Sequence, residues 1–251
     1  MPLLNHPTSS ETNPLDLIIV GAGFAGLYAL QRALNSNRSA VVLERGGDVG
    51  GTWYWNRYPG ARCDVQSMEY SYSFDEALQQ NWSWTERYAA QPEILDYANH
   101  VADRFSLRPH IRFDTLADSM TFLEDCSLWR TKTAKGDVFY SRFCIMATGC
   151  LSSTNLPDFE GRDDFKGEAY HTGNWPHEPV DFTGKRVGII GTGSSSIQSI
   201  PIIAASCAHL TVFQRTPNYS IPAHNGPIDE DYVQAIKQQY GDFRALNQQM
   251  F

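Results

Sequence analysis

The chain has 251 residues, of which 42% are hydrophobic and 19% are charged. These values are typical of a globular protein with one large domain or two smaller ones, and no apolar run approaches the length of a membrane span. A net charge of −8 without a Lys/Arg cluster argues against nucleic acid and anionic membranes as partners. The sequence has no C-x-x-C pair among its five cysteines, so we expect no disulfide framework, no metal site and a reducing, cytoplasmic compartment.

The N-terminal part of the chain predicts a βαβ unit. Residues 1–14 are polar, and we expect them to form a flexible tail. An apolar run at 17–20 is typical of a buried parallel strand, leucines at helical spacing follow over 24–34, and a second apolar strand covers 40–43. The order strand, helix, strand is that of a βαβ unit.

The middle of the chain is less regular. Residues 50–63 are rich in Gly, Trp, Tyr and Pro and are expected to form a long ordered loop, and the alternation of Tyr70, Tyr72 and Phe74 fits one face of a strand. A helix is predicted to begin at Gln91, because Pro92 suits a first helical position. Several short strand-like pieces over 111–140 predict an antiparallel meander, and 143–147 reads as a further apolar strand.

A second βαβ unit is predicted after a polar connection at 151–164, with strands at 186–190 and 210–213 around a helix at 194–205. Residues 229–251 are predicted to be helical, and no further strand follows. A dinucleotide-binding fold needs more parallel strands than this second unit supplies, so we expect the chain to be a fragment. The predicted fold class is α/β: two Rossmann-like dinucleotide-binding units, three-layered with mostly parallel sheets, plus an antiparallel β-meander, the second unit being truncated.

The turn after the first strand carries G-x-G-x-x-G at Gly21, Gly23 and Gly26. The first glycine allows the tight turn, the second lets the backbone approach a pyrophosphate at the helix N-terminus, and the third lets helix and strand pack closely. Glu44 ends the next strand, where a carboxylate accepts hydrogen bonds from ribose hydroxyls and repels a 2′-phosphate. The site therefore predicts FAD or NAD, whereas a mere tight turn would not require an acid at that position.

The second unit repeats the pattern, with Ser196 in place of the third glycine. Arg215 ends its next strand instead of an acid, and a guanidinium there can pair with a 2′-phosphate. An isolated arginine is more often a solvated surface cation, but its place one βαβ unit after Gly191 favours NADPH binding. The predicted NADP contacts in this unit are Gly191, Thr192, Gly193, Ser194, Ser195, Arg215 and Thr216.

The segment from Phe165 to Pro176 reads F-x-G-x-x-x-H-x-x-x-W-P. Taken by themselves, its histidine and tryptophan are more often structural than catalytic. The pattern nevertheless resembles the fingerprint of type I Baeyer–Villiger monooxygenases, whereas flavin-containing monooxygenases usually lack its Trp-Pro end. Residues 50–64 resemble that family's flavin-proximal loop and 147–149 its Ala-Thr-Gly linker. The resemblance runs from about Leu17 to the C-terminus and is closest to phenylacetone monooxygenase and steroid-oxidising relatives.

This resemblance implies FAD and NADP on two separate domains. It places the N-terminal part of the FAD domain at 15–150, a linker at 151–180 and an incomplete NADP domain at 181–251. His171 and Trp175 of the fingerprint would couple the two domains. The implied FAD contacts beyond the glycine motif are Gly51, Thr52, Trp53, Asp64 and Tyr70, although Tyr70 could equally be an aromatic core residue.

Asp64 would be the catalytic carboxylate that orients an arginine beside the flavin, and the resemblance puts that arginine beyond residue 251. Arg62 would reach NADP. The implied reaction uses NADPH and O2 to form a C4a-peroxyflavin, which inserts oxygen next to the carbonyl of a small-molecule ketone and gives an ester or lactone.

Two other functions remain open. A flavin-containing or N-hydroxylating monooxygenase would act on amines or sulfides, although Asp64 and the Trp175-Pro176 pair favour ketone oxidation. A catalytically incomplete nucleotide-binding fragment is the other alternative. We expect the parent protein to oxygenate ketones and the isolated chain to turn over poorly or not at all.

Overall fold

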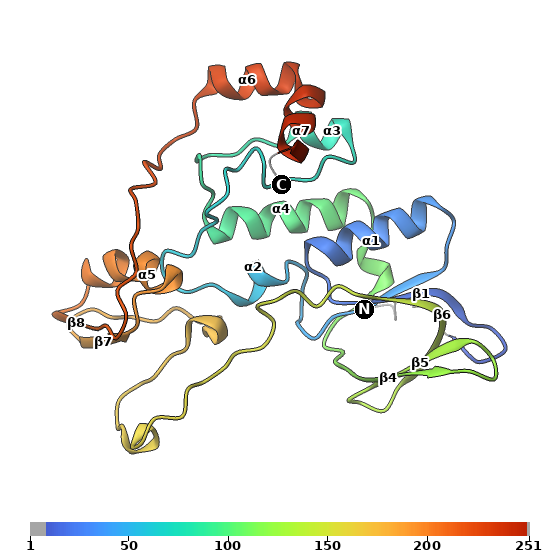
Figure 1. Ribbon diagram of the computed structural model, residues 1–251, viewed down its shortest axis with the longest axis horizontal. Helices are drawn as coiled ribbons and strands as arrows, with labels where there is room; N and C mark the ends of the chain where they lie inside the picture. The colour runs from blue at the N-terminus through green and yellow to red at the C-terminus, as the bar shows by residue number, and fades with distance from the viewer. Residues whose placement is uncertain (1–8, 250–251) are drawn as a thin grey trace. The chain divides into compact units, whose positions relative to one another are not determined.

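The computed structural model describes residues 9–249, which form two compact units (Figure 1). The first unit comprises the chain up to Trp55 together with Leu95–Asn174, and the second comprises Asn56–Ile94 together with Trp175 onward. Most of the predicted tail, residues 1–8, lies outside the described residues, as do 250 and 251. The domain boundaries expected at 150 and 180 stay a prediction.

The first unit is built on a six-stranded sheet with the order β3-β2-β1-β6-β5-β4. Its parallel part contains β1 (Leu15–Val20), β2 (Ala40–Leu43) and β3 (Ile111–Arg112), and its antiparallel part contains β4 (Ala117–Leu123) and β5 (Leu128–Thr133). This mixed, mostly parallel sheet confirms the predicted α/β class, the strands of the first βαβ unit and the meander.

One strand joins the two parts of this sheet. The nine-residue β6 (Val138–Met146) runs antiparallel to β5 through the pair Trp129 and Ser141, and parallel to β1 through the pair Leu17 and Phe143. The predicted separation of the meander from an apolar strand at 143–147 was wrong, because one strand covers both. The error arose because the polar stretch Ser141-Arg142 interrupts the apolar pattern, although the backbone pairing continues through it.

One helix covers the parallel part of the sheet and contacts a second helix. α1 (Phe24–Asn35) packs on β1 and β2 (Figure 1). The rings of Phe24 on α1 and of Tyr97 on α4 (Gln91–Arg104) lie 6.0 Å apart. The α1 side chains Leu27 and Leu30 are fully buried, and such burial stabilises by about 1.5–3 kcal/mol each. A separate apolar cluster, which contains residues of β1, β2 and β6, consists of Leu15, Ile18, Val41, Leu43 and Phe139.

The second unit contains a parallel pair of strands, β7 (Arg186–Ile190) and β8 (His209–Phe213), with α5 (Ser194–Ala204) packed on both. This confirms the second predicted βαβ unit, including a helix that accommodates Pro201. The single helix predicted for 229–251 is instead two helices, α6 (Glu230–Gln238) and α7 (Tyr240–Gln249), separated at Gln239.

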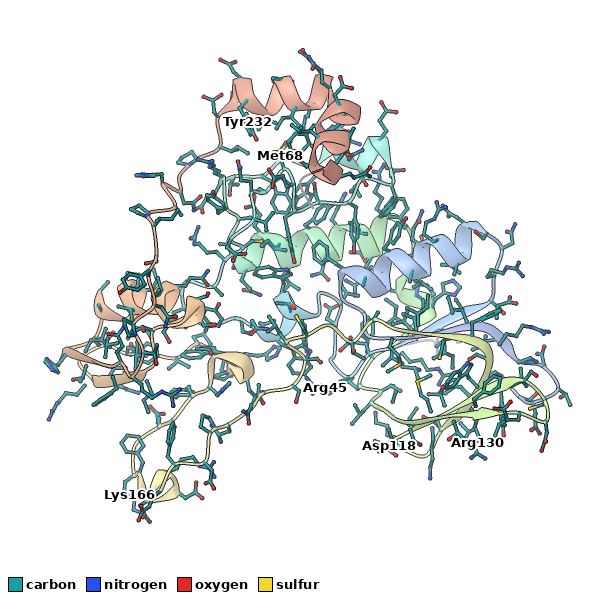
Figure 2. The ribbon with its side chains drawn as sticks, viewed as in Figure 1. Arg45, Met68, Asp118, Arg130, Lys166 and Tyr232 are labelled. Atoms are coloured by element: carbon teal, nitrogen blue, oxygen red, sulfur yellow. The ribbon has the colours of Figure 1, made fainter. Side chains whose placement is uncertain are left out.

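The two C-terminal helices hold a loop of the same unit. The Lys237 ammonium on α6 donates to the carbonyl oxygens of Gln80 at 2.7 Å and Trp82 at 2.9 Å, and burial lowers the pKa of Lys237. Arg244 on α7 donates to the carbonyl oxygen of Glu69 and to the Ser71 hydroxyl. Figure 2 labels Tyr232 on α6 and Met68 on this loop, and Met68 is buried.

The aromatic stretch Tyr70–Phe74 in that loop is irregular and contains bends, so its strand-like alternation does not correspond to a strand. A short helix that the sequence analysis missed, α3 (Glu76–Asn81), follows it, with the Asp75 carboxylate accepting from the Leu78 N–H at 2.6 Å. No helix among residues 9–249 is long and apolar enough to cross a membrane.

Candidate nucleotide-binding sites

The first glycine loop leaves no room for side chains at two of its three glycines. Gly21 has a φ of +103°, and a Cβ added there would lie 2.6 Å from the carbonyl oxygen of Ala147. A Cβ on Gly26 would lie 1.9 Å from the carbonyl oxygen of Gly21. Gly21 therefore has the conformation of the tight turn that the sequence predicted, and Gly26 lies in the close packing that was predicted for the third glycine.

The second glycine of this loop lies against the main chain of Gly51. Gly23 is the N-cap residue of α1, and because glycine has no side chain, no N-cap side chain accepts from the first N–H groups of the helix. A Cβ on Gly51 would lie 2.8 Å from the Gly23 Cα, and the Gly50 N–H donates to the Ala22 carbonyl oxygen at 3.0 Å. Glycines at this helix N-terminus suit the close approach of a pyrophosphate.

The same contacts place the predicted flavin contacts Thr52 and Trp53 next to the glycine loop. They begin a short helix, α2 (Thr52–Trp55), which the sequence analysis treated as loop, and the Trp53 side chain is buried. At the end of α2, the guanidinium of Arg45, which Figure 2 labels, lies 4.5 Å from the centre of the Trp55 ring. It also donates to the Ser152 carbonyl oxygen. The pairing of Arg45 with Trp55 is not evident in the sequence, because ten residues separate them.

Glu44 is buried directly below this loop, with 6% of its surface exposed. Its carboxylate accepts from the Ala22 N–H at 2.7 Å and from the Gly46 N–H at 2.6 Å. Each carboxylate oxygen can accept a further hydrogen bond, so the predicted role toward ribose hydroxyls is compatible with these contacts. The structure adds a second role, since Glu44 also holds the glycine loop in place.

The second glycine loop has a more open geometry. Gly191 has a φ of +99°, and its N–H donates to the Phe213 carbonyl oxygen at 2.8 Å. Gly193 is the uncapped N-cap of α5, and a Cβ added there would meet open space. Ser196 occupies the position that corresponds to Gly26 in the first loop. The second loop has room for this serine, because its Oγ lies 4.0 Å from a Cβ built on Gly191.

Two amides that the sequence analysis missed connect this loop to the segment after β8. Gln214 and Asn218 both donate to the Thr192 hydroxyl, at 3.0 and 3.3 Å. Arg215 and Thr216, between these two residues, are exposed. The structure therefore brings the segment of the predicted 2′-phosphate contact to the glycine loop.

The predicted active-site loop lies in the second unit. Residues 61–63 are extended and pair with 89–91: the Cys63 N–H donates to the Ala89 carbonyl oxygen at 3.0 Å, and the Gln91 N–H to that of Ala61 at 2.8 Å. Asp64 follows this bridge and is exposed, and Tyr70 is half-buried. Burial raises the pKa of the Cys63 thiol, so Cys63 is a packing residue.

Arg62 has an internal partner in this structure. Its guanidinium donates to the Glu86 carboxylate at 2.6 Å and to the Tyr88 carbonyl oxygen at 3.0 Å. The hydrogen bond from Arg62, with a second from Asn225, holds the pKa of Glu86 below its usual range. The predicted contact of Arg62 with NADP stays a prediction, and it would require this pair to be shared or opened.

The residues of the F-x-G-x-x-x-H-x-x-x-W-P segment have local structural roles. A Cβ on Gly167 would lie 2.5 Å from the ring of the exposed Phe165, so a larger residue there would require that ring to turn away. His171 Nδ1 accepts from the Gly173 N–H at 3.1 Å. The boundary between the two units falls between Asn174 and Trp175, inside this segment. A coupling role for His171 and Trp175 stays a prediction.

In the first unit, the structure brings together Gly21, Gly23, Gly26, Glu44, Gly51, Thr52 and Trp53. Among residues 9–249 there is no group of three or more His, Cys, Asp or Glu side chains that could hold a metal ion.

Residues 16–220 match the family model described as flavin-binding monooxygenase-like (FMO-like). The chain is 46% identical to a Baeyer–Villiger monooxygenase of Pseudooceanicola batsensis and 42% identical to a phenazine N-monooxygenase of Lysobacter antibioticus, over 96% and 92% of its length. It covers 44% and 43% of these two proteins, so it spans less than half the length of the curated relatives it matches.

A solved structure of an oxidised steroid monooxygenase bound to NADP shares 54% sequence identity with the chain. It superimposes with a TM-score of 0.90, over 93% of this chain and 45% of that one. With two glycine loops at strand ends, a glutamate after one and an arginine after the other, and a family match over most of its length, the chain belongs to the flavin-binding monooxygenase-like family.

Proposed function

We propose that this chain is the cofactor-binding N-terminal portion of a monooxygenase that binds FAD at the first glycine loop and NADPH at the second. The observation that carries the proposal is the contrast between Glu44, buried against the first loop, and Arg215, exposed beside the second. A carboxylate suits free ribose hydroxyls, whereas a guanidinium suits a 2′-phosphate. The steroid monooxygenase bound to NADP supports the second half of this assignment.

The proposed reaction of the whole protein is oxygen insertion next to a ketone carbonyl, with O2 and NADPH as co-substrates and an ester or lactone as product. FAD, when bound, supplies the redox centre that accepts the hydride of NADPH and activates O2. The residues of this chain would position it: Gly23 and Gly51 admit the pyrophosphate, Glu44 orients the ribose, and Asp64 presents an exposed carboxylate to a flavin-side cation. The Baeyer–Villiger relative supports ketones as the substrate class.

N-oxygenation is the second candidate, because a phenazine N-monooxygenase is 42% identical over almost the whole chain. An N-oxygenating protein therefore shares this portion at nearly the same identity as the Baeyer–Villiger relative. A product assay on a longer parent separates the two functions: an ester from a ketone supports the first, and an N-oxide from a heteroaromatic amine supports the second. The five free cysteines support a cytoplasmic location for either.

The first experiment is a visible absorption spectrum of the purified chain after desalting. We expect a flavin spectrum in the wild type and its loss in Gly23→Ala. Gly23 has an ordinary φ of −77°, and its added Cβ would lie 3.4 Å from the Gly51 Cα. The change therefore occupies the space proposed for the pyrophosphate without straining the backbone. A colourless wild-type protein with a folded circular dichroism spectrum would contradict FAD binding by this chain.

A further inference from the structure

We propose that Gln198 is a positioning residue that attaches the loop carrying Asp64 to α5, so that NADP binding at the start of α5 orders that loop. The inference rests on the proposed function, because it requires NADP at the second glycine loop. All the residues involved lie in the second unit.

The side-chain amide of Gln198 binds the Arg62 main chain from both of its polar ends. Its Nε2 donates to the Arg62 carbonyl oxygen at 3.0 Å, and its Oε1 accepts from the Arg62 N–H at a longer 3.4 Å. A primary amide has the donor and acceptor of a peptide group, so Gln198 takes the place that a neighbouring strand would occupy. In an extended segment, the N–H and C=O of one residue point to one edge and those of the next residue to the other, and Ala61 and Cys63 make their hydrogen bonds to residues 89–91. The segment before Asp64 is thus held along both edges.

Two further contacts attach the same loop to α5. The Tyr58 hydroxyl donates to Gln198 Oε1 at 2.8 Å. Gly60 has a φ of +80°, and a Cβ there would lie 2.3 Å from the Gln198 carbonyl oxygen, so the loop backbone rests directly on the helix. Gln198 is half-buried, which limits competition from water for its amide.

The route from ligand to loop is short. Gln198 lies four residues after Ser194, the first residue of α5, and therefore one helical turn from the uncapped N-terminus. A pyrophosphate bound there would accept from the free N–H groups and stabilise the first turn of the helix. Arg62, held by Gln198, lies two residues before Asp64. Occupancy of the NADP site would therefore reduce the motion of the loop that presents Asp64.

The test is amide hydrogen exchange of residues 58–64 in the purified chain, with and without NADP+, alongside NADP+ affinity by titration calorimetry. In the wild type we expect NADP+ to slow exchange in this loop about fivefold or more. Gln198→Leu should abolish that slowing and weaken NADP+ binding by no more than about the same factor, because coupling between loop and ligand is reciprocal and the Gln198 side chain is not among the predicted phosphate contacts. Gln198→Glu keeps the acceptor for Tyr58 but loses the donor to Arg62, and should retain part of the effect.

Gln80→Leu is the matched control, since Gln80 donates to the Lys237 carbonyl oxygen, away from this loop, and should behave as the wild type. NADP+ binding without any slowing in the wild-type loop would overturn the proposed coupling while leaving the proposed function intact. Equal slowing in Gln198→Leu and the wild type would also overturn it. A wild-type chain that binds no NADP+ would overturn both.

Discussion

The Glu44 carboxylate accepts from the Ala22 N–H at 2.7 Å, which ties the end of β2 to the glycine loop after β1. Its other oxygen accepts from the Gly46 N–H, so both oxygens are engaged by the main chain. The acid that the sequence marked as a nucleotide ligand is therefore also part of the frame of its own site. Substitution at this position should affect stability as well as binding.

Glu44→Gln should destabilise the first unit by about 1–3 kcal/mol, because an amide NH2 would then face a main-chain N–H in a buried site. Urea unfolding followed by circular dichroism measures the loss. The exposed Glu124→Gln is the control and should change stability by no more than about 0.5 kcal/mol. A Glu44→Gln protein as stable as the control would mean that the contacts with Ala22 and Gly46 contribute little.

Gly26→Ala should destabilise by about 3 kcal/mol or more, since its Cβ would lie 1.9 Å from the Gly21 carbonyl oxygen and must push α1 from the sheet. Gly241→Ala provides the contrast, because it lies within α7 with nothing near its added Cβ. That change should stabilise by about 0.5–1 kcal/mol. The two melting temperatures should therefore shift in opposite directions, and a shared direction would contradict the packing described for the first loop.

Arg62→Met should raise the pKa of Glu86 toward its ordinary value, as followed by carbon NMR of the carboxyl during an acid titration. Because the folded pKa of Glu86 is depressed, the Arg62–Glu86 pair contributes stability above the ordinary pKa of a glutamate and loses it as pH falls through the folded value. The side chains are about one-third exposed, so the contribution should be small. An unchanged titration of Glu86 in Arg62→Met would show that Asn225 alone sets this pKa.

Arg215→Gln should weaken NADP+ binding about 10- to 100-fold and leave NAD+ binding unchanged, because only NADP+ carries the 2′-phosphate. Calorimetric titration with both nucleotides gives the ratio. Arg186→Gln removes another exposed arginine of the same unit and should change neither affinity. Equal weakening toward both nucleotides would indicate a general electrostatic effect instead of recognition of the phosphate.

Local patterns were sufficient for the two βαβ units and both glycine loops. The bounds of β2 and β7 matched the prediction residue for residue, because a short run of apolar residues, four in β2 and four apolar or small residues after Arg186 in β7, has few alternatives to a buried strand. The requirement for glycine at positions 21 and 26 also followed from the motif, since the spacing of G-x-G-x-x-G encodes contacts within one short turn.

Patterns failed where distant contacts determine the conformation. Tyr70–Phe74 alternates like a strand but finds no partner strand, and the loop is instead held by Arg244, more than 170 residues later in the chain. Arg62 lies 136 residues from Gln198, and nothing in either local sequence pairs them. The membership of 56–94 in the second unit was unpredictable for the same reason. Periodicity reports which face of a segment is buried, whereas the partner that buries it depends on the path of the whole chain, and only the folded structure contains that path.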